Sequence, residues 1–222
     1  MNYDFLINTM LFRGMSRADA EGMLSCLGAH EKKYVKDEII YHAGECVESM
    51  GLVISGSVDL VIDDMWGNST ILGRAAAGQL FAETYACVPG EPLMVNAVAN
   101  EKCEVLFLNA GKIMTTCRNA CPFHSMLIRN LLKISSVKNL ELSRRSVYTS
   151  SRSIRVRLTS YLSGQSKRAG SYQFRIPFNR QQLADYLGVD RSAMSNELSK
   201  MQRDGLITYE KNNFKINTDA RM

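Results

Sequence analysis

The spacing of apolar and polar residues divides the chain into a β-rich N-terminal stretch and a mostly helical C-terminal part. Ahead of the β-rich stretch, Ser16 to Leu27 predicts a short amphipathic helix with Ser16 as its cap. From about Tyr34 to Leu108 the apolar runs are short, and glycine-containing turns separate them. We expect strands at residues 39–41, 51–54, 58–62, 70–72 and 105–108. This pattern is typical of a small antiparallel barrel or sandwich.

Beyond Asn109 the pattern returns to helix, and Pro122 suits the first turn of a long one. Apolar residues then recur at steps of three and four, at Phe123, Leu127, Leu131, Ile134 and Val137. A helix of about 25 residues would be about 37 Å long. Its apolar seam favours pairing with the same helix of a second copy. The alternative is that the seam packs only on the chain's own β-rich domain.

A polar Ser-, Thr- and Arg-rich run from Arg144 to Arg152 predicts a hinge after the long helix. Beyond the hinge, the apolar spacing predicts a helix from Ile154 that ends at Gly164, and then a strand at residues 172–176. The predicted domains are therefore residues 1–120, the long helix at 121–148, and residues 149–222.

Residues 179–205 have the pattern of two short helices joined by a tight turn. Asn179 can cap the first helix, and Gly188 suits the left-handed backbone of its exit. Asp190 can cap the second helix, whose apolar stripe is Met194, Leu198 and Met201. A hairpin follows at residues 206–216, so the pattern indicates a winged helix-turn-helix. The alternative is an ordinary helical hairpin within a globular core.

The polar side of the second helix is the candidate DNA-reading surface, because Arg and Asn can bind guanine and adenine edges with two hydrogen bonds. The candidate DNA-binding residues are Arg180, Arg191, Ser192, Ser195, Asn196 and Lys200.

The distribution of charge supports a polyanionic partner for the C-terminal part. Residues 144–222 hold 15 Lys and Arg against 6 Asp and Glu, so this part has a net charge of +9. Residues 1–143 have a net charge of −4. The basic excess therefore coincides with the predicted helix-turn-helix, as binding to double-stranded DNA requires.

No signal peptide or membrane-spanning run is visible, so we expect a cytoplasmic protein without a membrane partner. The six cysteines are scattered, and reduced structural thiols are the expectation. Cys117 and Cys121 lie four residues apart and form an alternative thiol switch or metal pair.

An enzyme is disfavoured. A cupin-like oxygenase needs clustered His and carboxylate ligands, and the β-rich stretch offers only His42 without a second histidine nearby. The chain contains neither a GxSxG nucleophile motif nor a GxxxxGK[ST] phosphate loop. We expect no catalytic residue, no metal site and no cofactor.

The β-rich domain, long helix and basic winged helix-turn-helix together resemble the Crp–Fnr superfamily of bacterial transcription regulators. The resemblance covers nearly the whole chain. It is most specific at residues 182–206 and in the glycine-punctuated run of Gly44-Glu45, Gly51–Gly56 and Gly78-Gln79-Leu80-Phe81. It implies an α+β fold with an N-terminal antiparallel, jelly-roll-like β-roll, a dimerisation helix and a winged helix-turn-helix. It places Arg191, Ser192, Ser195 and Asn196 at base-contacting positions. Many relatives carry arginine where Asn196 stands.

The resemblance also implies an effector site in the β-roll. Glu83 and Thr84 match the short helix of the cyclic-nucleotide-binding members, but Leu93 and Met94 stand where those members carry an Arg-Ser pair for the phosphate. A buried phosphate needs a charged donor. We therefore expect an effector other than cyclic AMP, in an apolar pocket. The candidate effector-binding residues are Glu83, Thr84, Leu93, Met94, Leu127 and Leu131.

Relatives with an iron–sulfur cluster have several closely spaced N-terminal cysteines, whereas this chain has only Cys26 in that region. Its three histidines show no ligand spacing for haem. The predicted function is a dimeric regulator of palindromic DNA sites, gated by a small-molecule effector, with RNA polymerase as a further candidate partner. The alternatives are a constitutive DNA binder with a structural β-roll, and a redox-sensing regulator that uses Cys117 and Cys121.

Overall fold

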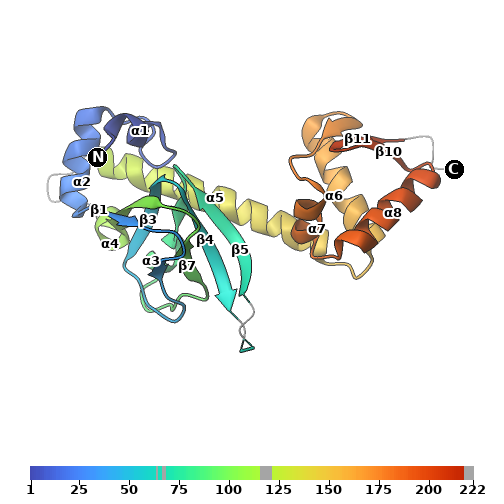
Figure 1. The fold of residues 1–222 in the computed structure, drawn as a ribbon. Helices are drawn as coiled ribbons and strands as arrows, with labels where there is room; N and C mark the ends of the chain where they lie inside the picture. Colours follow the sequence, from blue (N-terminus) through green and yellow to red (C-terminus); the bar gives the residue numbers. More distant parts are fainter. Residues whose placement is uncertain (64, 67–68, 116–121, 218–222) are drawn as a thin grey trace. The chain divides into compact units, whose positions relative to one another are not determined.

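The structure is a computed structural model that describes residues 1–63, 65–66, 69–115 and 122–217. The chain forms two compact units, Met1–Ser136 and Val137–Met222, and the division between them falls inside the long helix. Figure 1 shows the elements of both units.

The N-terminal unit combines short helices with two antiparallel sheets. Its helices are α1 (Tyr3–Asn8), α2 (Arg17–Leu27), α3 (Glu83–Ala86), α4 (Ala110–Met114) and the first part of α5 (Pro122–Thr149). Its strands are β1 (His30–Tyr34), β2 (Ile39–Tyr41), β3 (Ser49–Ser55), β4 (Ser57–Asp63), β5 (Ser69–Ala76), β6 (Leu80–Phe81), β7 (Asn96–Ala99) and β8 (Cys103–Asn109). The sheet orders are β1-β8-β3-β6 and β2-β7-β4-β5. The antiparallel β-roll that the sequence predicts is confirmed.

Side chains alternate between the two faces of the sheet β1-β8-β3-β6, called the first sheet below, and along β3 and β8 both faces are buried. Leu52 and Leu106 point to one face and join a core with residues of α1, α2, α4 and α5. Val53 and Val105 point to the other face and join the core inside the roll. Figure 1 shows α1, α2 and the start of α5 grouped at the same side of the roll. The helices are therefore part of this domain's core.

The apolar seam of α5 serves this core more than a second copy. Leu127, Leu131 and Ile134 are buried in it, at 0%, 6% and 8% exposure. Val137 remains exposed at 46%. The expectation that these three residues face a partner helix is therefore wrong, because the helical layer over the first sheet needs their side chains.

The C-terminal unit has its own core. Its elements after α5 are α6 (Ile154–Ala169), β9 (Gln173–Arg175), α7 (Arg180–Leu187), α8 (Arg191–Arg203), β10 (Ile207–Glu210) and β11 (Asn213–Ile216). The strands form an antiparallel sheet in the order β10-β11-β9. Side chains from all these elements and Tyr148 of α5 form one buried cluster. The predicted winged helix-turn-helix is confirmed.

The expected end of α6 at Gly164 is wrong. The helix continues to Ala169, and Gly170 ends it in the left-handed conformation at φ 61°. Gly164 lies inside the helix, where an added Cβ would come within 2.2 Å of the Tyr148 hydroxyl oxygen. This glycine makes room for a side chain of α5 instead of ending the helix.

Residues 150–153 separate α5 from α6, within the run where the sequence predicts a hinge. Helix α5 itself continues to Thr149 and has 28 residues. Among the described helices, none combines the length and apolar character that a bilayer crossing needs.

Candidate nucleic-acid interface

The turn between α7 and α8 is fixed by capping residues. Gln182 N donates to Asn179 Oδ1, and Asn179 N donates to Gln182 Oε1, both at 2.9 Å. Gly188 ends α7 in the left-handed conformation, at φ 62°. Asp190 caps α8 because its Oδ1 accepts from Ala193 N at 2.7 Å. These are the caps that the sequence predicts, so the local geometry of the helix-turn-helix is confirmed.

Helix α8 has one buried face and one exposed face. Met194, Leu198 and Met201 are at most 2% exposed and hold the helix on the core. Arg191, Ser192, Asn196 and Lys200 are exposed and Ser195 is half-buried. The structure therefore places the predicted reading residues together on the solvent side of one helix.

The side chains of these polar residues differ in whether a hydrogen bond or an ion pair already engages them. Ser195 Oγ donates to the Arg191 carbonyl at 2.9 Å, and Lys200 Nζ lies 3.9 Å from Glu197 Oε2. Within the described residues, no hydrogen bond or ion pair engages the side chain of Arg191 or Asn196. Arg191, Ser192 and Asn196 are consequently the side chains of this set most available to a ligand.

Arg180, the first residue of α7, is held by the wing rather than projecting into solvent. Its Nη2 donates to the Lys211 carbonyl at 2.7 Å, and its guanidinium lies over the rings of Tyr209 and Phe214 at 5.0 and 5.2 Å. Burial lowers its pKa from the usual arginine value. Its Nη1 is buried and has no hydrogen-bond partner among the described residues. A half-buried guanidinium with one unsatisfied nitrogen favours an anionic partner.

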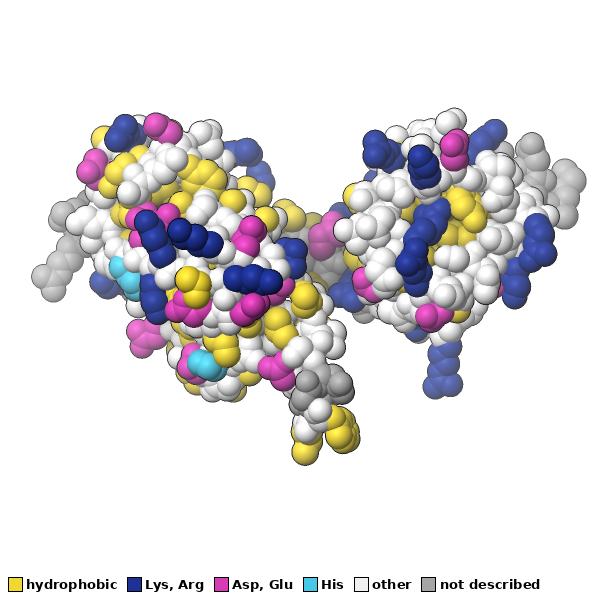
Figure 2. Space-filling view, viewed as in Figure 1, with side chains coloured by type: hydrophobic (Ala, Val, Ile, Leu, Met, Phe, Trp, Pro, Cys, Tyr) yellow, Lys and Arg dark blue, Asp and Glu magenta, His cyan; other side chains and the backbone are white. Residues whose placement is uncertain are grey.

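A hollow of about 560 Å³ lies beside this guanidinium. Its lining comes from the start of α7, the start of α8 and the turn of the wing: Asn179, Arg180, Gln181, Arg191, Lys211 and Asn212. On the face shown in Figure 2, Lys and Arg side chains lie around and across the C-terminal unit. The hollow brings together two predicted residues, Arg180 and Arg191. Gln181, Lys211 and Asn212 are additional lining residues, and the sequence pattern does not predict the last two because only the folded wing carries them to α7.

The C-terminal end of α7 is held by two arginines from other helices. Arg145 of α5 donates to the carbonyls of Asp185 and Tyr186 at 3.2 and 3.0 Å. Arg157 of α6 donates to the carbonyls of residues 187 and 188 at 2.8 and 2.9 Å. Carbonyls at a helix end have no intrahelical partner, and a cation there complements the helix dipole. We call this pair the carbonyl clamp.

The predicted effector-binding residues do not gather around one described cavity. Leu127 and Leu131 belong to the core between helices and sheet, whereas Leu93 belongs to the core inside the roll. Glu83 is buried at 4% exposure, but Met94 is 67% exposed. Thr84 is exposed as well. An effector site lined by all of these residues stays a prediction.

The residues present do not match a phosphate site of the cyclic-nucleotide type. Glu83 begins the short helix α3, as the resemblance implies, and Ala82 before it is left-handed at φ 57°. The run Pro92 to Val95 carries no cation, and the Leu93 side chain is directed into the core. A cyclic phosphate at this run would lack a charged donor.

The predicted thiol pair, Cys117 and Cys121, lies outside the described residues. Cys26 and Cys46 are exposed. Burial raises the pKa of Cys103, whose side chain belongs to the core inside the roll. Within the described ranges, no group of three or more His, Cys, Asp or Glu side chains is arranged to hold a metal ion.

Known families match both units. Residues 31–120 match the cyclic nucleotide-binding domain, and residues 156–220 match the Crp-like helix-turn-helix domain. Among curated proteins, the chain is 22% identical over 190 residues to the CRP-like protein Clp of Xanthomonas oryzae pv. oryzae (strain PXO99A), with 81% of this chain and 80% of Clp covered.

Two solved structures show the same fold. One is described as the c-di-GMP responsive global regulator CLP of Xanthomonas campestris; it has a TM-score of 0.56 and 18% identity, with 90% of this chain and 99% of that chain covered. The other, CprK complexed with OCPA, has a TM-score of 0.62 and 19% identity, with 87% of this chain and 90% of that chain covered. The two domain matches in this order, with the winged helix-turn-helix geometry, show that the chain belongs to the Crp–Fnr superfamily of bacterial transcription regulators.

Proposed function

We propose that the protein is a dimeric regulator that inserts α8 into the major groove of a palindromic DNA site. The observation that carries this proposal is the exposed, unengaged pair of Arg191, at the first position of α8, and Asn196, on the face of α8 opposite its buried stripe. Arginine suits the O6 and N7 acceptors of guanine, and asparagine suits the N6 and N7 edge of adenine. Ser192 and Ser195 lie on the same helix and complete the reading surface.

Backbone phosphate is the anion that best suits the hollow beside Arg180. The Nη1 atom of Arg180 lacks a partner among the described residues, and Arg191 and Lys211 also line this space. A phosphate there would satisfy the buried guanidinium and fix the position of α8 on the duplex. Lys200, farther along α8, would add a second backbone contact.

Dimerisation would use the exposed side of α5. Val137, Leu140 and Val147 are 46%, 54% and 65% exposed, and helical geometry places them on one side of the helix. Leu132, at 65% exposure, lies within the same broad sector. Two-fold pairing of this helix would present two reading helices about one turn of DNA apart, roughly 10 bp.

A small effector other than cyclic AMP is proposed to gate the regulator from its N-terminal domain, because no cation stands in the run Pro92 to Val95. A ligand gates DNA binding only if it binds the two functional states with different affinity. RNA polymerase is the proposed further partner, and action on DNA would place the protein in the cytoplasm. A constitutive DNA binder is the second candidate, since the apolar residues predicted to line the pocket are packed in two cores.

The test begins with selection of a binding site from a random duplex pool at low ionic strength. Arg191→Ala should weaken binding to the selected site by about 1–3 kcal/mol and relax one base position, since it removes a contact to a base edge. Lys167→Ala is the matched control, because Lys167 is an exposed cation on α6, outside the reading helix. Fluorescence anisotropy against the selected and point-changed duplexes gives both values.

Three outcomes contradict the proposal. Absence of any selected duplex removes the DNA-binding function. Equal weakening on all sequences by Arg191→Ala places this residue on the backbone instead of a base. Loss of affinity with Lys167→Ala as large as with Arg191→Ala means that general charge, not α8, dominates binding.

A further inference from the structure

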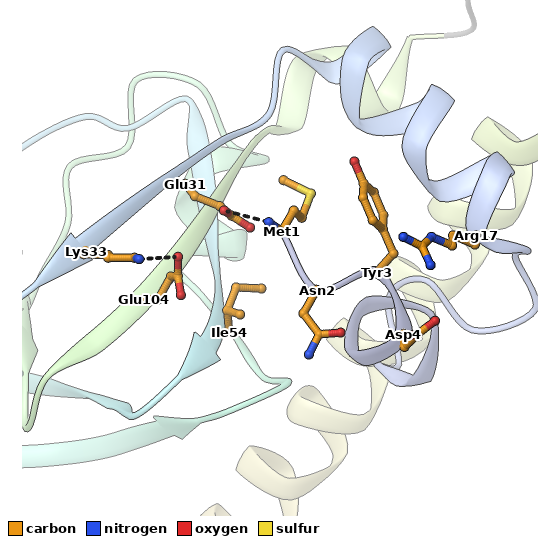
Figure 3. A pocket seen from close by; sticks show the side chains of 9 residues that line it. All are labelled: Met1, Asn2, Tyr3, Asp4, Arg17, Glu31, Lys33, Ile54 and Glu104. Carbon is orange, nitrogen blue, oxygen red and sulfur yellow. Dashed lines mark ion pairs between the residues drawn. The ribbon is translucent and has the colours of Figure 1, made fainter.

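A second hollow lies in the N-terminal unit, at the edge of the helical layer over the first sheet. It has a volume of about 470 Å³. Figure 3 shows Glu31, Lys33 and Glu104 on its sheet side and Arg17 on the opposite side, with Met1 and Asn2 between them. This place is distinct from the α3 region, where the resemblance puts a nucleotide.

The register of the sheet explains why the space is open. Glu31 pairs with Leu106, and Lys33 pairs with Glu104, so these four residues share one face. The helices cover this face at Leu106, which is 0% exposed. Farther along β8 and β3, Glu104 and Ile54 remain partly exposed beyond the helical layer. The floor of the hollow therefore consists of Ile54 together with the charged residues Glu31, Lys33 and Glu104.

The carboxylates on this floor keep unused hydrogen-bonding capacity. Glu31 Oε2 lies 3.8 Å from the amino group of Met1, and Glu104 Oε1 lies 3.7 Å from Lys33 Nζ. Both separations are longer than a hydrogen bond. Glu31 Oε1 is buried and has no hydrogen-bond partner among the described residues. A buried carboxylate oxygen without a donor is unfavourable, so this atom favours a ligand that brings an N–H group.

The opposite wall offers a cation. Arg17, in the first turn of α2, lies over the ring of Tyr3 at 5.5 Å. Across the described ranges, no hydrogen bond or ion pair engages its guanidinium. The five donors of an arginine are suited to binding a carboxylate with two hydrogen bonds. The hollow thus presents two carboxylates, beside Lys33 and the Met1 amino group, on one side, and Arg17, beside Asp4, on the other.

We propose that this hollow binds a small zwitterion of the free amino acid class. The ammonium group would pair with the carboxylates of Glu31 and Glu104, while the carboxylate would accept from Arg17. The side chain of the ligand would rest on Ile54 and Tyr3. The volume falls within the range of small-molecule sites, roughly 300–1,000 Å³. This inference goes beyond the proposed function, because it needs neither DNA nor the α3 region.

Titration calorimetry on the full chain tests the proposal, with the twenty common amino acids tried one at a time. At least one should bind, and ethylamine and acetate, which each carry only one of the two charges, should bind at least about tenfold more weakly. Glu31→Gln and Arg17→Gln should each weaken binding of that amino acid by roughly tenfold or more, since each removes one charge-assisted hydrogen bond. Glu21→Gln is the matched control, because Glu21 is an exposed α2 residue outside the hollow, and it should leave binding unchanged.

Thermal unfolding of the three variants verifies that each is folded before its titration is interpreted. The proposal is overturned if the wild-type chain binds none of the amino acids, or if binding survives both Glu31→Gln and Arg17→Gln. Ethylamine that binds as tightly as the best amino acid overturns the assignment of a zwitterion, because the site would then recognise the ammonium alone. None of these results bears on DNA binding, so the two proposals fail separately.

Discussion

At the scale of single residues, Gly164 shows how one missing side chain permits a contact between two helices. Tyr148 of α5 is only 8% exposed, and its ring packs on those of Tyr161 and Tyr186 at 5.6 and 6.4 Å. Its hydroxyl occupies the place that a Cβ of residue 164 would take. The last turns of α5 are thereby fixed on the C-terminal core.

Gly164→Ala should destabilise the C-terminal unit by about 1–3 kcal/mol, because the new methyl group displaces the packed Tyr148 ring. In an open helix the same change stabilises by roughly 0.5–1 kcal/mol. Gly22→Ala is the matched control, since Gly22 lies within α2 and has open space at its Cβ position. Urea unfolding monitored by far-UV circular dichroism compares the two. A stabilising Gly164→Ala would show that Tyr148 moves without cost.

Several buried titratable groups predict a loss of stability at alkaline pH. Burial raises the pKa of Cys87 and Cys103, and it raises the pKa of Tyr34 to about 12. The unfolded chain loses these protons at lower pH than the folded chain does. The contribution of these groups to the free energy of unfolding should therefore be constant below about pH 8 and fall between about pH 9 and 12, by up to about 1.4 kcal/mol per pH unit for each group.

Urea midpoints measured across this window check the pH prediction. Cys103→Ala should reduce the slope with pH, because one of the linked protons is gone, whatever it does to stability at neutral pH. Cys26→Ala, at an exposed thiol, should leave the slope unchanged. A flat profile up to pH 11 would contradict the prediction.

At the scale of elements, the carbonyl clamp joins three helices at one end of α7. Arg157 Nε also donates to the Ser151 carbonyl at 2.5 Å, so this residue connects the segment after α5 to the turn of the helix-turn-helix. Arg155, on the same helix, pairs with Glu197 and Asp204 at 2.5 and 2.7 Å. Helix α6 thus holds both α7 and α8.

Arg157→Lys should lower the free energy of unfolding of the C-terminal unit by about 1–3 kcal/mol, because one ammonium cannot reproduce the forked contact with three carbonyls. It should also speed hydrogen exchange at the amides of α7. Arg152→Lys is the control, at an exposed arginine in the neighbouring linker. Equal exchange in both variants would mean that the clamp does not hold α7.

Elements with a clear period or cap were predictable from the sequence, and elements that depend on tertiary packing were not. The capping residues Asn179, Gly188 and Asp190 act locally, so both helices of the helix-turn-helix were found. Strand β1 was missed because its sequence, HEKKY, is mostly charged and one of its faces lines an open hollow. The predicted end of α6 was wrong because the sequence does not distinguish a glycine that makes room for a neighbouring side chain, as Gly164 does, from one that ends a helix.

In the candidate interface too, residues placed by local sequence were predictable and residues placed by tertiary packing were not. Asn196 could be predicted, because helical periodicity separates the exposed side of α8 from its buried side, and Arg191 could be predicted because it directly follows the N-cap Asp190 at the exposed start of the helix. The contribution of Lys211 and Asn212 could not, because the β10–β11 hairpin brings them to α7 across about thirty residues of sequence. The engagement of Arg180 by Tyr209 and Phe214 has the same origin.

At the scale of the whole molecule, the proposed dimer places a direct requirement on α5. The buried side of this helix is used by the N-terminal core through Leu127, Leu131 and Ile134, so a partner is left with the exposed side. An exposed stripe of Leu132, Val137, Leu140 and Val147 is unusual for a helix that remains alone in water.

Leu140→Glu should convert the proposed dimer to monomer, because a pair of carboxylates would then face each other in an apolar seam. Leu142→Glu is the matched control: Leu142 is 67% exposed but lies on another side of the helix. Analytical ultracentrifugation gives the masses. A wild-type monomer, or a dimer that survives Leu140→Glu, would contradict pairing through this side.

The sharing of α5 between two cores also bears on the order of events during synthesis. The helix-facing side of the sheet β1-β8-β3-β6 is covered partly by Leu127, Leu131 and Ile134, which the ribosome adds after the last strand of the roll. A nascent chain that has emerged only as far as residue 115 therefore exposes apolar surface on a finished sheet. We expect the roll to need chaperone protection until residue 134 leaves the exit tunnel, when the first half of α5 closes the N-terminal core ahead of the DNA-binding half of the chain.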